Sequence, residues 1–135
     1  MSFTRFLLVY AVTLPVFFAI DLVWLGLVAK TFYRQHLGHL LAAEVNWVAA
    51  IAFYVLFIAG IVFFAVKPAL DVNSASRALV YGALFGFFTY ATYDLTNHAT
   101  MRAWPAIVTA VDMAWGTVLS ASVAYLSYQL ASRAW

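Results

Sequence analysis

The 135-residue sequence contains no cysteine, and only 9% of its residues are charged. The lack of cysteine excludes disulfides, thiolate metal sites and thiol nucleophiles. The scarcity of charge excludes a soluble domain, in which about a quarter of the residues are charged. With a net charge of +2 and no Lys/Arg cluster, nucleic acid is not an expected partner. What the sequence has instead is 67% hydrophobic and 19% aromatic residues, a composition that predicts an integral membrane protein.

Four apolar stretches are long enough to cross a bilayer, which takes about 20 residues. The predicted spans cover residues 6–29, 45–66, 76–98 and 104–132. The first is too long and too polar at its end for a cleaved leader. The second is expected to end at Lys67-Pro68, because proline commonly follows the end of a helix. The sequence therefore predicts an all-α bundle of four transmembrane helices that forms one membrane domain, residues 1–135.

The connection between the first two spans, residues 30–44, has apolar residues at helical spacing and is expected to contain a short interfacial helix. With four spans, both termini lie on the same side of the membrane. That side would carry four cations and the other side three (Arg5, Lys67, Arg77 and Arg133 against Lys30, Arg34 and Arg102). The positive-inside rule then favours termini in the cytoplasm.

Three of the four spans contain a single aspartate, and all three aspartates approach the same end of the bundle. At about 1.5 Å per residue, Asp21, Asp94 and Asp112 lie about 12, 6 and 10 Å from that end. The second span begins there with Asn46. Aromatic and amide side chains recur at helical spacing around the aspartates. The sequence predicts an outward-facing polar cavity formed by Asp21, Trp24, Asn46, Tyr90, Tyr93, Asp94, Asn97, Asp112 and Trp115.

Further residues are expected close to this cavity. Gly82 and Gly86 form a G-x-x-x-G pattern on the stripe of the third span that also carries Asp94, and Gly116 shares a stripe of the fourth span with Asp112. Small residues of this kind allow two transmembrane helices to approach closely. Tyr33 and His98 lie near the same end of the bundle and are included as binding residues.

Three segments of the sequence resemble a known family: Asp21-Leu-Val-Trp-Leu-Gly26, Tyr90-Ala-Thr-Tyr-Asp-Leu-Thr-Asn97 and Asp112-Met-Ala-Trp-Gly116. They are similar to the predicted membrane proteins grouped as Domain of Unknown Function 2177, and the similarity covers essentially the whole chain. The resemblance implies a bacterial inner-membrane protein of about this length. It implies no activity, so the function has to be argued from the residues.

An aspartate at the centre of a transmembrane helix costs about 2.5 to 3.5 kcal/mol, so each of the three must face the bundle and find a partner or a proton. One interpretation is that they form interhelical hydrogen bonds, each worth about 0.6 kcal/mol. In the other, Asp21, Asp94 and Asp112 are catalytic. A protonated carboxyl would act as general acid and an ionised one as base on a lipid-like or isoprenoid molecule. Neighbouring aromatic faces could stabilise a carbocation by up to about 2 kcal/mol.

Acid–base chemistry of this kind requires no cofactor, and none is predicted. His36, His39, His98, Asp94 and Glu44 lie near the same end, but no pair within a span has a spacing typical of metal ligands, so no metal site is predicted.

Two other classes of function stay open. In the first, the protein is a structural or assembly subunit that packs against a second copy, a larger membrane complex or a pigment, and membrane lipid is a partner in any case. In the second, it translocates protons or ions, for which a titratable intramembrane cluster is typical. The apolar cytoplasmic half of the bundle offers no second half-channel and argues against a monomeric transporter.

Overall fold

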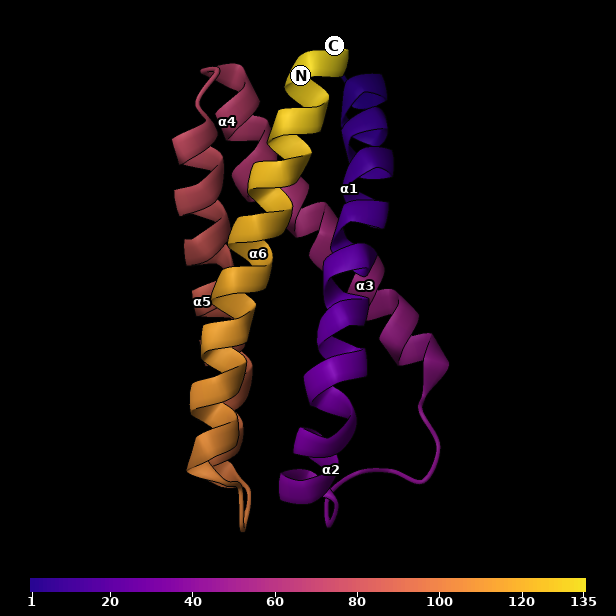
Figure 1. Ribbon diagram of the computed structural model, residues 1–135, viewed down its shortest axis with the longest axis vertical. Helices are drawn as coiled ribbons and strands as arrows, with labels where there is room; N and C mark the ends of the chain where they lie inside the picture. The colour runs from indigo at the N-terminus through magenta and orange to yellow at the C-terminus, as the bar shows by residue number, and fades with distance from the viewer.

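The computed structural model describes residues 1–135 and contains only helices, which confirms the predicted all-α bundle (Figure 1). Several helical segments follow one another without a break, and the bounds are α1 (Phe3–Trp24), the π-helix η1 (Leu25–Ala29), α2 (Lys30–Leu37), α3 (Trp47–Ile61), the π-helix η2 (Val62–Val66), α4 (Lys67–Asp71), α5 (Ala75–Thr100) and α6 (Ala106–Ala134). Figure 1 shows both chain ends at one end of the bundle and α2 at the other.

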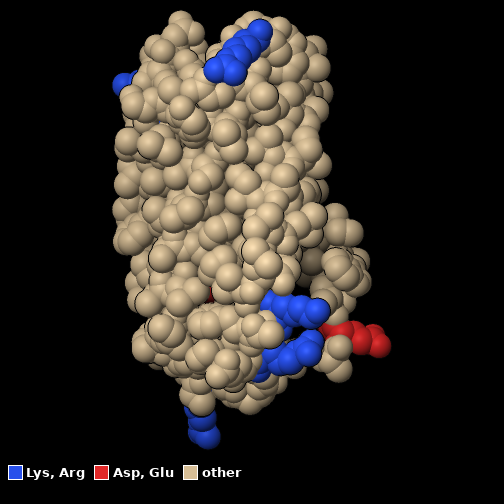
Figure 2. Space-filling model, viewed as in Figure 1, with Lys and Arg blue, Asp and Glu red and all other residues tan.

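Three helical stretches are long and apolar enough to cross a membrane: Phe3–Leu37, Trp47–Asp71 and Ala106–Ala134. Their most apolar 18-residue windows have mean hydropathies of 2.3, 2.7 and 1.5. The fourth long helix, α5, has 26 residues but is less apolar, because its second half is rich in Thr, Tyr, Asp and Asn. It lies alongside α6 (Figure 1). Charged side chains stand at the two ends of the molecule, and the broad band between them is uncharged on the face seen in Figure 2.

Polar caps fix where three of the helices begin. The side-chain oxygens of Ser2, Asn46 and Ser74 accept hydrogen bonds from backbone N–H groups three residues ahead, at 3.1, 3.2 and 3.2 Å. Such caps satisfy N–H groups that have no partner within the helix. Between α4 and α5 the chain turns at residues 72–74, and Ser74 caps α5.

The prediction that the second helix ends at Lys67-Pro68 is wrong, because the helix continues through α4 to Asp71. Proline lacks an N–H group and its ring clashes with the preceding turn of a regular α-helix. Here the π-helix η2 ends at Val66, two residues before the proline, and π-helical turns change the hydrogen-bonding register locally. The chain turns only at Val72 and Asn73, where Asn73 adopts a φ of 52°.

The short helix expected between the first two spans is α2, but it is continuous with the first span. Helical backbone runs from α1 through η1 into α2, and α2 ends at Leu37 rather than extending towards residue 44. Residues 38–46 cross to α3 without regular helix. As a consequence, Tyr33 is attached rigidly to the helix that carries Asp21.

Helices α5 and α6 make the most extensive contact in the bundle, and glycines bring their backbones together. A Cβ atom on Gly82 would lie 2.6 Å from the Ser120 carbonyl oxygen, and one on Gly86 would overlap the carbonyl oxygen of Gly116. A Cβ atom on Gly116 would overlap the ring of Tyr90. Glycine therefore sets the separation of the two helices and the position of Tyr90.

Candidate functional site

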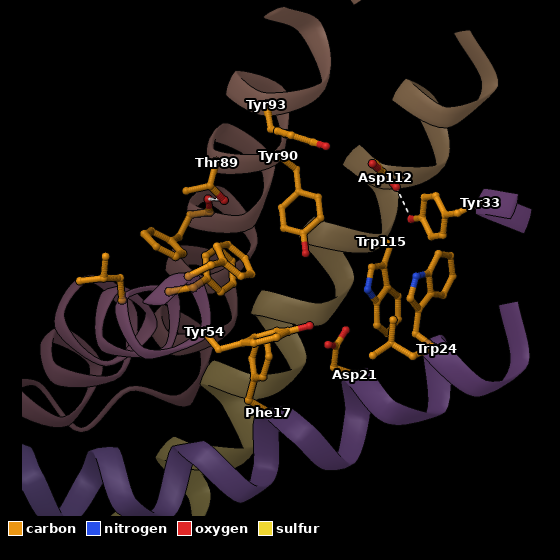
Figure 3. Close-up of a pocket in the computed structure, with 15 residues that line it drawn as sticks. Phe17, Asp21, Trp24, Tyr33, Tyr54, Thr89, Tyr90, Tyr93, Asp112 and Trp115 are labelled. Carbon is orange, nitrogen blue, oxygen red and sulfur yellow. Dashed lines mark hydrogen bonds between the residues drawn. The ribbon is translucent and has the colours of Figure 1, made fainter. Parts of the chain in front are cut away.

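A cavity of about 740 Å³ lies between the first helical stretch, α3, α5 and α6, towards the α2 end of the bundle (Figure 3). Twelve of its fifteen lining residues are hydrophobic. The lining consists of Phe17, Asp21, Trp24, Leu25, Tyr33, Phe53, Tyr54, Leu56, Phe57, Phe85, Thr89, Tyr90, Tyr93, Asp112 and Trp115. A volume between about 300 and 1,000 Å³ with mostly apolar walls and a few polar groups is typical of a small-molecule site.

Asp21 is buried on α1 and its carboxylate points into the cavity (Figure 3). It faces the indole N–H of Trp115, from α6, and the hydroxyl of Tyr54, from α3. The Tyr90 hydroxyl, from α5, points towards the same space. Three helices therefore each supply a polar group near the aspartate of the fourth.

Asp112 is buried on α6 and accepts a hydrogen bond from the Tyr33 hydroxyl (Figure 3). The indole N–H of Trp24 faces the Tyr33 oxygen. Because Tyr33 belongs to α2, this hydrogen bond fixes the end of the first helical stretch against the start of α6.

The two aspartate sites are joined by a pair of indole rings. Trp24 and Trp115 stack with their ring centroids 4.4 Å apart and their planes 6° from parallel. Each aspartate is three residues before one of the tryptophans, so the stack brings the two matching Asp-x-x-Trp segments together. The stacked rings separate Asp21 from Tyr33 and Asp112 along this wall of the cavity (Figure 3).

Asp94, on α5, is completely buried behind the wall, and neither of its carboxyl oxygens has a hydrogen-bond partner. The group beside it is the carboxyl of Asp112. Two ionised carboxylates are both acceptors and repel each other, so no hydrogen bond can join them without an added proton. A single proton shared between Asp94 and Asp112 would supply the missing donor and remove the repulsion.

The cavity is bounded on one side by residues that also reach the outer surface of the bundle. Leu56 on α3 is 72% exposed and Tyr93 on α5 is 58% exposed. Both also line the cavity, so the cavity reaches exposed side chains of α3 and α5.

The structure brings together seven of the predicted site residues as lining of one cavity, namely Asp21, Trp24, Tyr33, Tyr90, Tyr93, Asp112 and Trp115. Asp94 adjoins the cavity through Asp112. Asn97 is half-buried and close to Tyr93 but does not line the cavity. Asn46 is an exposed helix cap, and the exposed His98 pairs with Thr109 at 3.2 Å.

Sequence reasoning missed Tyr54 and the phenylalanines that line the apolar part of the cavity. Tyr54 carries the only hydroxyl group in the second span. A single hydroxyl in an otherwise charge-free helix could have marked Tyr54 as a site residue. Phe17, Phe57 and Phe85 carried no such signal, because the chain has twelve phenylalanines and each of the first three spans contains several.

The three histidines do not converge on the aspartates. His36 contacts the backbone oxygen of Phe32 at 2.9 Å, and His39 contacts that of Ala103 at 3.2 Å. No three His, Asp or Glu side chains lie together in an arrangement that could hold a metal ion.

The family model described as "Predicted membrane protein (DUF2177)" matches residues 6–129, which include every residue that lines the cavity. No curated protein and no solved structure matches the chain.

Proposed function

The chain belongs to the DUF2177 family of predicted membrane proteins, and we propose that its cavity binds a lipid-like or isoprenoid molecule and acts on it by acid–base chemistry. The observation that carries the proposal is the buried Asp94 carboxyl, which has no hydrogen-bond donor and lies against Asp112 at the cavity wall. A carboxyl kept only for helix packing would be hydrogen-bonded, because an unsatisfied buried polar group destabilises the fold.

The character of the lining supports an apolar ligand. The polar groups of the lining gather around Asp21 and Asp112, whereas Phe17, Leu25, Phe53, Leu56, Phe57 and Phe85 offer no polar group to a ligand. The exposed outer sides of Leu56 and Tyr93 would allow a ligand to enter from the bilayer between α3 and α5. The membrane would then serve as the reservoir of the ligand.

The carboxyl groups can divide the acid and base roles between two sites. The proton shared by Asp94 and Asp112 would be transferred to one carbon of a ligand double bond, whose π electrons form the new C–H bond and leave a carbocation. Asp21 would take a proton from the carbon on the other side of the cationic carbon, and the electrons of that C–H bond would form the shifted double bond. Atoms and electrons balance in this isomerisation without a co-reactant.

Two further features fit such a reaction. The Trp24–Trp115 stack lies at the cavity wall between the two acidic sites, where an indole face can attract a cation. Tyr90 is close to all three carboxyl groups, so its hydroxyl could relay the proton from Asp21 back to the acidic pair. Tyr90 is itself held in place by Gly116.

We also propose a location and an orientation for the protein. The resemblance to the family favours a bacterial inner membrane. The end that holds both termini carries four cations against three at the α2 end, so the positive-inside rule favours cytoplasmic termini. The cavity would then face the outer leaflet.

The test is to replace Asp112 or Asp94 by Asn in cells and to compare the extracted lipids with those of wild-type and deletion strains. We expect both variants to accumulate in the membrane at the wild-type level and to give the lipid profile of the deletion. Asp71→Asn is the matched control, because Asp71 is exposed and pairs only with Lys67, at the far end of the bundle.

Folded Asp112→Asn and Asp94→Asn proteins with a wild-type lipid profile would refute the acid–base proposal. If those variants instead lost the protein from the membrane, the aspartates would act as interhelical hydrogen-bond partners of a structural or assembly subunit. An unchanged lipid profile together with a lower proton flux in proteoliposomes would support translocation.

A further inference from the structure

The cavity has an apolar end and a polar end. On α1, Phe17 lies towards the middle of the bundle and Asp21 follows one turn closer to the α2 end. On α5, Phe85 and Tyr93 repeat this order in the same direction. A molecule with an apolar tail and a polar head would therefore lie with its tail towards the bilayer centre and its head towards α2. Lipids in a single leaflet have this same orientation.

Two cations stand at the polar end without a carboxylate partner. Lys30 and Arg34 are exposed on α2, and their spacing of four residues places them on one helical face. The only ion pair in the molecule joins Lys67 to Asp71 at the opposite end of the bundle. Figure 2 shows basic side chains at this end with one acidic side chain near them. By sequence, the acidic residue outside the cavity at this end is Glu44.

Tyr33 connects these cations to the cavity. It follows Lys30 by three residues and directly precedes Arg34, and its ring lines the cavity while its hydroxyl binds Asp112. One helical turn is about 5.4 Å long. Lys30 and Arg34 are therefore both within one helical turn of a residue of the cavity wall, and both have long, flexible side chains.

We propose that the molecule bound in the cavity carries a phosphate ester as its headgroup, and that Lys30 and Arg34 bind this phosphate at the α2 end. The inference rests on the proposed function and specifies its ligand class. A phosphate monoester carries a charge of about −1.5 to −2 at neutral pH, which two cations match. The guanidinium of Arg34 can donate two parallel hydrogen bonds to phosphate oxygens.

The experiment compares two probes with the same tail, farnesyl phosphate and farnesol, on the full chain in nanodiscs of zwitterionic lipid. Binding is followed by tryptophan fluorescence, because Trp24 and Trp115 line the cavity. We expect farnesyl phosphate to bind the wild type at least ten times more tightly than farnesol. A Lys30→Gln/Arg34→Gln double variant should lose most of this difference and retain farnesol binding.

Arg102→Gln provides the matched control, since Arg102 lies in the turn between α5 and α6 at the same end and lines no cavity. It should keep the wild-type preference for farnesyl phosphate. An equal loss in Arg102→Gln would overturn the proposal, because it would indicate general surface attraction. Equal affinities of the wild type for the two probes would also overturn it. Competition by millimolar inorganic phosphate, without any contribution from the tail, would indicate a site for free phosphate only.

The outcomes distinguish a failure of the headgroup inference from a failure of the proposed isoprenoid ligand. If farnesol binds and the phosphate adds nothing, the headgroup inference fails while a cavity for apolar ligands stands. If neither probe changes the fluorescence at any concentration, both the inference and the proposed isoprenoid ligand fail.

Discussion

Replacement of Asp94 by Asn separates a structural role of the buried carboxyl from a chemical one. Asparagine has nearly the same shape as aspartate, carries no charge and brings an NH₂ group with two donors. Asp94 is fully buried, and its two oxygens have no donor. An amide at this position could donate to the Asp112 carboxylate beside it. The substitution is therefore expected to supply the donor that two ionised carboxylates lack.

The expected change in stability follows from three contributions. Two ionised carboxylates about 4 Å apart would repel by about 4 kcal/mol at an effective dielectric constant of about 20, and a single proton on the pair would remove this repulsion. A hydrogen bond to a charged group contributes about 1.5 to 3 kcal/mol, and the amide can replace the one that the shared proton provides. The third contribution, the cost of burying the rest of the polar side chain, is similar in both proteins. We expect the free energy of unfolding of Asp94→Asn to be at most about 1 kcal/mol below that of the wild type, and it could exceed the wild-type value.

The free energy of unfolding can be measured by titrating the protein in detergent micelles with SDS and following the helical circular dichroism signal. Asp71→Asn is the reference, since it removes an exposed ion pair with an N–O distance of 3.1 Å and should cost no more than about 1 kcal/mol. A loss of more than about 2 kcal/mol in Asp94→Asn would refute the reasoning. The carboxyl would then contribute to packing in a way that an amide cannot replace.

Two further predictions concern the frame around the cavity. Gly86→Ala should destabilise the bundle by about 1 to 3 kcal/mol, because the added methyl group would overlap backbone atoms of Gly116. Gly26→Ala is the control and should not lower stability, because no atom lies within 4 Å of the added Cβ. Equal SDS titrations of the two variants would contradict this. Tyr33→Phe removes the hydrogen bond to Asp112 and should increase hydrogen exchange in α2 but not in α5. Unchanged exchange in α2 would show that this bond does not hold the segment.

Much of the fold was predictable from the sequence, because membrane helices must satisfy their backbone groups internally and are strongly apolar. The cap at Ser74 and the close approach at Gly86 follow from the same local rules. The continuation past Pro68 was not predictable in this way. It depends on a π-helical turn in η2, and no residue in Val62–Val66 distinguishes such a turn from a regular helix in advance.

Seven residues of the candidate site were predictable from the sequence, but their arrangement was not. Burial cost alone requires Asp21, Asp94 and Asp112 to face the interior. Their relative depth depends on how each helix is rotated and tilted, and this is set by packing between helices. The structure consequently places Asp94 behind Asp112 instead of beside the cavity, and it brings Tyr54 in opposite Asp21.

The distribution of hydrogen-bond donors distinguishes between the two roles proposed for the aspartates. Asp112 receives a hydrogen bond from Tyr33, and Asp21 faces an indole N–H and a hydroxyl, so a donor stands beside each of them, as it would beside a helix-packing residue. Asp94 has no such donor, although it is the most deeply buried of the three. Helix packing has no use for a second carboxyl against Asp112, since Asn or Ser would bind there without repulsion. A second carboxyl is useful if the pair has to gain and release a proton, and the adjoining cavity is where that proton could be transferred.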